Sequence, residues 1–182
     1  THGITGAWAP GNSLYVQDTD RDLFRVEGGQ WIEIADAKAL GDALVVGMKS
    51  QQGVLTAVNE WGVFWTYQSG TWTQTLDAEL RAAHVYSAAV LDDGGWALGT
   101  ISDGISIWDA QGRKKYQLGS SNGIKNNTVL SIHQDDQAHI WLGLDNGIIC
   151  INNRAPLRSY VDQQSEWGTI YASAHWKDIT YL

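Results

Sequence analysis

The sequence predicts an all-β fold, specifically a β-propeller built from four-stranded antiparallel blades. Three observations lead to this prediction. Two stretches of the chain repeat one another 43 residues apart. Short β-branched and aromatic runs alternate with Gly, Asn, Asp and Ser. The 182 residues contain 20 Gly and 10 Trp but only 2 Pro, which suits many short hairpins. A sequence repeat of about 40–45 residues that consists of short strands is typical of propeller blades.

The clearest repeat lies in the second half of the chain. Asp92 lies 43 positions before Asp135, and Gly104 lies 43 positions before Gly147. Between these points, Trp-Ala-Leu-Gly at 96–99 corresponds to Ile-Trp-Leu-Gly at 140–143. Weaker copies of the repeat start at residues 60 and 20, so the pattern predicts further repeat units toward the N-terminus.

Each repeat unit is predicted to contain four strands. In the clearest unit these are 128–134, 138–144, 147–152 and an outer strand at 157–162. The Asn146-Gly147 pair predicts a type I′ hairpin turn, whose twist matches that of the strands. Residues 102–104 are expected to form the equivalent turn in the preceding blade.

Counting units predicts a partial propeller that occupies the whole chain, 1–182, as one domain. We expect blades at about 4–36, 40–79, 84–120 and 126–163, and the start of a fifth at 169–182. The second strand of the fifth begins at Ile179, and the chain stops at Leu182, one residue before the expected glycine. We therefore expect a fragment of a longer protein; the alternative is a degenerate last strand in a small natural protein. A partial ring exposes strand edges and apolar blade faces, which predicts self-association or binding to another chain.

Composition and charge exclude several classes of partner. The net charge of −8 argues against nucleic acid, which is bound by neutralising phosphates. No apolar run reaches the roughly 18 residues that a membrane span needs. The single Cys150 cannot form an internal disulfide, and its alternating position predicts buried packing.

The best-repeated residues are predicted to be scaffold. Trp96 and Trp141 are expected to cover area between adjacent blades. Gly99 and Gly143 follow them where strands crowd and a missing side chain permits close approach. The acidic pairs at 92–93 and 135–136 are expected to accept turn amides, as Asx-turns do. Neither these pairs nor the Asp-rich stretch at 18–22 has calcium-loop spacing, and the five histidines are scattered, so we predict no metal site and no cofactor.

These motifs resemble the two-component regulator propeller repeat. The resemblance rests on 129–132, the acidic pair at 135–136, 139–143 and 145–148, with a linker-like lead-in at 122–128. It is strongest over about 84–163. The resemblance implies large propellers that form the periplasmic sensor region of hybrid two-component histidine kinases in Bacteroidetes. Those sensors respond to oligosaccharides, so an oligosaccharide is the ligand that the resemblance implies.

Ligand contacts are expected on the turns that connect the second and third strands. Trp61 lies in such a turn rather than in a strand, and an indole face suits the C–H face of a sugar. Asn59 beside it offers hydrogen bonds to hydroxyls. Asp103, Asp145 and Asn146 occupy the equivalent turns of the next two blades. The alternative is that all five are ordinary turn formers, with Trp61 on the surface or at a contact between blades or subunits.

Three functions remain open from the sequence, and we rank the sensor first. An interaction scaffold has one cue, the Trp-Asp pair at 108–109, which does not recur at 151–152. A carbohydrate-active propeller enzyme has none, because the chain lacks the Gly-x-Ser-x-Gly, His-Glu-x-x-His and phosphate-loop motifs. We therefore predict no catalytic residues in this chain.

Overall fold

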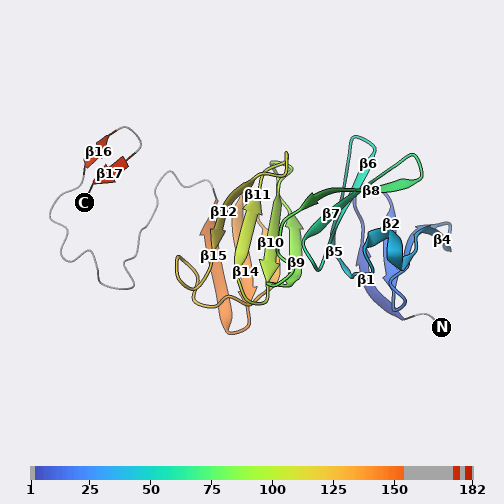
Figure 1. The fold of residues 1–182 in the computed structure, drawn as a ribbon, viewed down its shortest axis with the longest axis horizontal. Coiled ribbons are helices and arrows are strands. Elements are labelled where there is room, and N and C mark those ends of the chain that lie inside the picture. Colours follow the sequence, from blue (N-terminus) through green and yellow to red (C-terminus); the bar gives the residue numbers. More distant parts are fainter. Residues whose placement is uncertain (1–2, 154–173, 177–178, 182) are drawn as a thin grey trace.

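The computed structural model describes residues 3–153, 174–176 and 179–181, and it confirms an all-β propeller architecture (Figure 1). The only helix among these residues is a short 3-10 turn, η1 (Ala37–Leu40). The strands, in chain order, are β1 (Ile4–Trp8), β2 (Leu14–Asp18), β3 (Leu23–Glu27), β4 (Gln30–Ala35), β5 (Val45–Gln51), β6 (Val54–Asn59), β7 (Val63–Gln68), β8 (Thr71–Asp77), β9 (Val85–Val90), β10 (Trp96–Thr100), β11 (Ile105–Trp108), β12 (Lys114–Leu118), β13 (Val129–Gln134), β14 (His139–Leu144), β15 (Gly147–Asn152), β16 (Ala174–Trp176) and β17 (Ile179–Tyr181).

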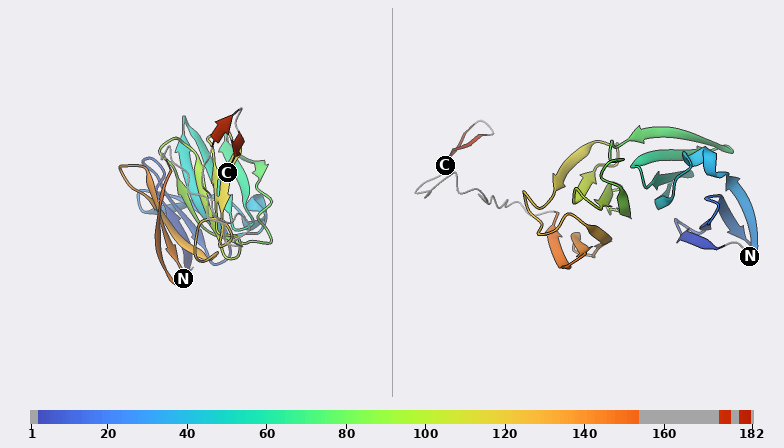
Figure 2. Two further views of the ribbon diagram at one scale, coloured as in Figure 1. Left: turned by 90° about the vertical axis from the view of Figure 1, so that its left-hand side faces the viewer. Right: turned by 60° about the horizontal axis from the view of Figure 1, so that its bottom comes forward.

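The strands form successive antiparallel sheets in chain order. Blades one to three are the four-stranded sheets β1–β4, β5–β8 and β9–β12, and blade four is described as the three strands β13–β15. First strands of neighbouring blades lie side by side, β1 with β5, β5 with β9 and β9 with β13. Figure 2 shows the four sheets following one another along an arc. This is the arrangement that a propeller requires.

Two predicted segments of the chain fall wholly or partly outside the described residues. The outer strand expected at 157–162 lies entirely there, as does the beginning of the predicted fifth blade at 169–173. In the remainder of that segment the structure describes β16 and β17, which pair antiparallel, and β17 begins at Ile179, where the second strand was predicted.

The hydrophobic core lies between the blades rather than within any one sheet. One cluster joins blades one and two around Leu23, Val45 and Leu55. A second joins blades two and three, where Phe64 meets Trp96 edge-on at 5.5 Å. A third joins blades three and four around residues such as Ile107, Ile140 and Leu142. Each blade is therefore stabilised by its neighbours, as expected for a repeat architecture.

The repeat register is 44 residues in the second strand and 43 in the third. Gly99 pairs with Ser87 in the same way as its counterpart Gly143 pairs with Ser131, so these glycines are equivalent. In the third strands Gly99 pairs with Ile105 and Gly143 pairs with Ile148, so the connection between the paired residues is one residue shorter in blade four. The predicted equivalence of Asp92 and Asp135 is therefore wrong by one position.

The predicted type I′ turn at Asn146-Gly147 is also wrong. Gly147 already belongs to β15, where it pairs with Leu144, and the turn consists of Asp145 and Asn146. Neither turn residue is among the non-glycine residues with positive φ, whereas a type I′ turn needs positive φ at both central positions. Among residues 144–147 of this hairpin, only Gly147 has a positive φ, of 151°.

Trp96 and Trp141 occupy opposite faces of their blades. Trp96 is 4% exposed and packs toward blade two, as predicted for an inter-blade tryptophan. Trp141 is 43% exposed, because Ile140 and Leu142 on either side of it face blade three. Cys150 pairs with Trp141 on this open face and is exposed, so its predicted burial is wrong.

The acidic pairs form the turns predicted for them. Asp135 Oδ1 accepts hydrogen bonds from the backbone amides of Gln137 and His139, at 3.0 and 2.9 Å. Asp93 Oδ1 accepts the backbone amide of Gly95 at 2.9 Å. Both carboxylates therefore stabilise the turn between the first and second strands of their blades.

Candidate functional site

The turns that carry the five predicted contact residues lie at one end of the blades. These turns follow β6, β10 and β14, and antiparallel order brings the blade-to-blade connections to the same end. Backbone hydrogen bonds join the two kinds of loop, from Glu60 N to Leu44 O, from Gly104 N to Asn127 O and from Asp145 N to Thr128 O. We call this face, formed by turns 60–62, 101–104 and 145–146 with connections 36–44, 78–84 and 119–128, the turn face.

Asn59 stabilises its turn from the inside. Its side chain is buried, and its Oδ1 accepts the backbone amides of Trp61 and Val63 at 3.1 and 3.0 Å. Its Nδ2 donates to Leu40 O at 3.0 Å. A sugar hydroxyl would have to displace these bonds, so the geometry gives Asn59 the role of a turn former.

Trp61 lies at the seam between blades two and three. His84 meets the indole edge-on, with ring centroids 5.4 Å apart, and the Arg81 guanidinium lies 5.1 Å from the ring centroid. Both partners come from the connection between β8 and β9. The half-buried indole therefore makes the inter-blade contact that was one of the two interpretations of this residue.

Glu60 is the turn-face residue that sequence reasoning missed. Its side chain is 8% exposed, and its Oε1 accepts the backbone amide of Leu44 at 3.0 Å. Its Oε2 lies 3.3 Å from Nε2 of His84. Glu60 therefore links both connections that flank blade two. The sequence feature that could have identified Glu60 is its position beside Trp61 in the same turn. The ligand-contact prediction used the aromatic ring of Trp61 instead.

Asp103 lines a polar cavity of about 370 Å³ on the turn face. Its other walls come from β12 and the connection that follows, namely Gln117, Gly119, Ser121, Asn122 and Asn127. Asn122 Oδ1 accepts the backbone amide of Gly119, and Asn127 Oδ1 accepts that of Ser120, both at 2.6 Å. The linker therefore has a fixed shape and supplies most of the cavity wall, which the sequence did not indicate.

Asp145 and Asn146 are exposed on the turn of blade four. Neither lines the cavity at Asp103. The structure thus places the predicted contacts in three settings on one face: Asn59 buried, Trp61 at a seam, and the other three exposed.

Metal ligation and membrane insertion have no candidate among the described residues. Within 3–153, 174–176 and 179–181, no three His, Cys, Asp or Glu side chains gather as they would to hold a metal ion. No helix in the same stretches of the chain is long and apolar enough to cross a membrane.

Solved structures that resemble this chain include an extracellular domain of a two-component system, a WD40 β-propeller domain and a lyase. The extracellular domain of the proposed hybrid two component system BT4673 from B. thetaiotaomicron matches 81% of the chain with a TM-score of 0.60 and 21% identity. The WD40 β-propeller domain of Doa1 matches 84% with a TM-score of 0.68 and 13% identity. Streptogramin B lyase matches 78% with a TM-score of 0.60 and 16% identity.

The chain is short beside these structures. It covers 21% of the BT4673 domain, 51% of the Doa1 domain and 47% of the lyase. No protein-family model and no curated protein matches its sequence. At these identities the likeness is one of fold, and it establishes that the described part of the chain has a β-propeller fold.

Proposed function

We propose that this chain belongs to the extracytoplasmic sensor propeller of a hybrid two-component system and that its turn face binds an oligosaccharide. The observation that carries the proposal is the polar cavity of about 370 Å³ beside Asp103. Its lining of one carboxylate, side-chain amides and a serine offers both donors and acceptors, which the hydroxyls of a sugar require. The match to the extracellular domain of BT4673 supports the sensor assignment.

The cavity is large enough for a portion of a sugar chain. Ligand sites typically measure about 300–1,000 Å³. A longer saccharide bound there would extend over the turn face, where Asp145, Asn146 and Trp61 are the contacts we propose beyond the cavity. Asn59 would support such a site by holding the Trp61 turn in place.

Glycan titration tests this function. A panel of oligosaccharides is titrated by calorimetry against wild type, Asp103→Ala and Asn127→Asp, with Asp92→Ala as control, because Asp92 is exposed at the opposite end of blade three. We expect a glycan whose affinity falls about tenfold in the two cavity variants, as losing hydrogen bonds at a ligand site predicts. Absence of glycan binding, or equal binding by all four proteins, contradicts the proposal.

Trp61 has a separate test, because its ring already contacts Arg81 and His84. Trp61→Ala should weaken binding of long saccharides and leave single sugars unaffected, if the indole contacts only the extended portion of a ligand. Equal binding of long saccharides by wild type and variant removes Trp61 from the site without affecting Asp103.

A periplasmic location and a kinase partner belong to the same proposal. The gene that encodes this chain should also encode a membrane-spanning segment and a histidine kinase core. Fractionation of cells that express the full gene should recover the propeller with the inner membrane and accessible from the periplasm. A catalytic domain in place of the kinase would contradict the sensor assignment.

An interaction scaffold is the second candidate, and one observation favours it. The open face of blade four presents Trp141 at 43% exposure and Ile148 at 78%. Exposed apolar groups at an unpartnered sheet face suit contact with another protein or a second copy of this chain. A carbohydrate-active enzyme ranks third; its fold precedent is the lyase, and we propose no catalytic residues for it here.

A further inference from the structure

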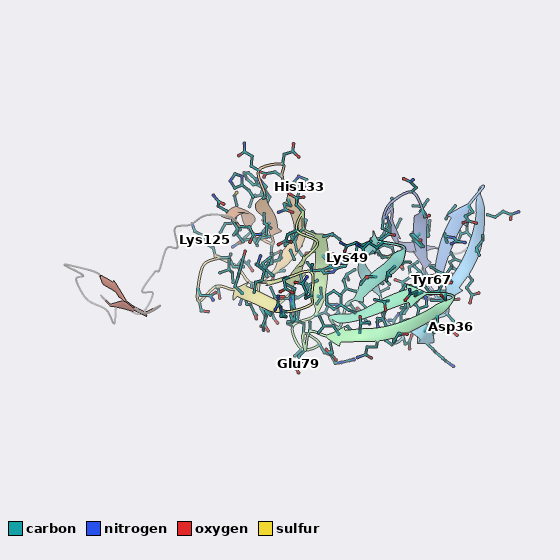
Figure 3. The ribbon with its side chains drawn as sticks, turned by 90° about the horizontal axis from the view of Figure 1, so that it is seen from above. Asp36, Lys49, Tyr67, Glu79, Lys125 and His133 are labelled. Atoms are coloured by element: carbon teal, nitrogen blue, oxygen red, sulfur yellow. The ribbon has the colours of Figure 1, made fainter. Side chains whose placement is uncertain are left out.

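A groove of about 230 Å³ separates blades two and three at the end opposite the turn face. Its floor crosses blade two from β5 to β8, and its roof consists of two tryptophans and a turn of blade three. Lys49 lies at this seam, where Figure 3 labels it. The lining side chains and backbone are those of Lys49, Thr56, Phe64, Thr66, Thr75, Leu76, Trp96, Trp108 and residues 109–112.

The groove exists because one row of the repeat is polar in blade two. Strand pairing places Lys49, Thr56 and Thr66 directly across from one another on β5, β6 and β7. The corresponding row of blade three is Ala89, Ala97 and Ile107, which pair across β9, β10 and β11. This row lies two residues along β10 from Gly99. In that row Ala97 and Ile107 are fully buried against blade four. Blade one has aromatic residues, Trp8 and Tyr15, in its first two row positions, and both belong to the core between blades one and two.

Polar residues at this row are costly for the scaffold, which favours a functional reason for them. A half-buried lysine and two half-buried threonines occupy this row, where the same fold uses apolar side chains at the next seam, and removing polar groups from water costs free energy unless they form hydrogen bonds. Burial lowers the pKa of Lys49, partly offset by the nearby negative charge of Asp93. A perturbed titratable group that lines a groove is a recognised mark of a binding site.

Lys49 lines the groove and also the neighbouring hollow that contains Asp93 and Gly94. Its Nζ donates to Gly94 O at 2.7 Å and lies 5.3 Å from the centroid of the Trp96 ring. An ammonium group has three donors, and this bond uses one of them. Lys49 therefore supplies a cationic donor for an anion at this end of the groove, beside Asp93 and beside Asp109, whose carboxylate is paired with Arg113.

The roof of the groove is aromatic and rigid. Trp96 is 4% exposed and is fixed edge-on against Phe64. Trp108 is 7% exposed, and its Nε1 already donates to Ser106 Oγ at 2.9 Å, so it offers the groove its carbon surface. A flat ring between this roof and the threonine hydroxyls would stack on one side and form hydrogen bonds on the other.

We infer that the groove between blades two and three binds a small hydroxylated ring carboxylate, with its carboxylate on Lys49, its ring face against Trp96 and Trp108, and its hydroxyls toward Thr56 and Thr66. The volume suits one six-membered ring, because it lies below the roughly 300 Å³ or more typical of larger ligands. This site is separate from the turn face and does not depend on the function proposed there.

Two acids, each with an uncharged counterpart, test whether the ligand is a sugar acid or an aromatic acid. Glucuronate is a sugar acid and 4-hydroxybenzoate an aromatic acid; glucose and 4-hydroxybenzyl alcohol are their uncharged counterparts. Ligand-observed NMR and calorimetry on the 182-residue chain should show one acid binding at least about tenfold more tightly than its uncharged counterpart, since a charge-assisted hydrogen bond is stronger than a neutral one. If neither acid binds more tightly than its counterpart, the inference is overturned.

Lys49→Met removes the charge and keeps a long apolar stem. We expect it to abolish the preference for the acid while the thermal midpoint stays the same or rises, because a half-buried cation whose pKa is lowered by burial has been removed. Lys115→Met is the matched control, since Lys115 pairs with Asp93 but does not line the groove. Acid binding by Lys49→Met equal to that of wild type overturns the inference.

Thr56→Val and Thr66→Val give an independent reading if Lys49→Met does not fold. Valine has nearly the shape of threonine, so these variants should fold and lose about threefold to tenfold in affinity for the acid, as loss of one neutral hydrogen bond predicts. Unchanged affinity in both variants contradicts the proposed placement of the ligand. Glycan binding at Asp103 should be unaffected in all these variants, so the two sites can fail separately.

Discussion

The indole nitrogen of Trp141 donates a hydrogen bond of 2.9 Å to Oδ2 of Asp135 and so links a strand tryptophan to the turn before its strand. Nδ1 of His139 lies 3.1 Å from the same carboxylate oxygen. The indole hydrogen bond is the largest cause that lowers the pKa of Asp135 to about 2, and hydrogen bonds from the backbone and side chain of His139 add to it. Asp135 therefore favours folding most strongly in its charged form.

Asp135 should make folding sensitive to acid. Because its folded pKa lies below the ordinary value of 3.8, its contribution is fully present above about pH 4 and is lost as the pH falls toward 2. Urea unfolding of Asp135→Asn should give a lower midpoint than wild type at pH 6 and a smaller difference at pH 3. Asp136→Asn is the control and should leave the midpoint nearly unchanged. A difference that does not depend on pH would contradict the assignment.

Gly99 should tolerate a methyl group far less well than its counterpart Gly143. A Cβ at Gly99 would lie 2.7 Å from Cγ1 of Val129 in the neighbouring blade. At Gly143 the close neighbour is the hydroxyl of Ser131, which can rotate away on an exposed residue. Gly99→Ala should lower the free energy of unfolding by about 1–3 kcal/mol, as overpacking does, and Gly143→Ala by less. Equal losses would show that the two glycines serve strand geometry rather than blade packing.

The two glycines also show what the sequence could and could not predict. The three described strands of blade four were predicted to within one residue, because β-branched alternation and turn residues are local signals. The register of the repeat was not, because the connection from Gly143 to its partner Ile148 is one residue shorter than that from Gly99 to Ile105. A shift of one residue in a strand exchanges its faces. Trp141 was therefore expected at a buried seam and lies on an open face.

Asn59 should matter for stability more than its exposed neighbours on the turn face. Asn59→Ala leaves the amides of Trp61 and Val63 without their side-chain acceptor and Leu40 O without its donor. Each buried unsatisfied group costs about 1–3 kcal/mol, so we expect a loss of at least about 2 kcal/mol in urea unfolding. Asn146→Ala, at an exposed turn, should change the free energy of unfolding by less than about 0.5 kcal/mol. A small effect of Asn59→Ala would make this side chain a candidate ligand contact again.

Residue type alone did not distinguish these two asparagines. Asparagine forms turns and binds sugars with the same amide, so only burial separates the two roles. The cavity at Asp103 was hidden for another reason, since its wall is a linker whose shape depends on the hydrogen bonds of Asn122 and Asn127. The polar row that begins at Lys49 becomes visible only when the strand register is known, because it is defined by comparison with the same row in blade three.

The open face of blade four should drive self-association. Ile148 is 78% exposed and lies on the same face as Trp141, which pairs with Cys150 two residues further along β15. Light scattering over a range of concentrations should show wild type associating, and Ile148→Glu should weaken this association about tenfold, since it places a charge in an apolar contact. Thr71→Glu, an exposed change on the outer strand β8, is the control and should associate like wild type. Monomeric wild type at high concentration, or equal association of Ile148→Glu, would mean that this face is not the contact.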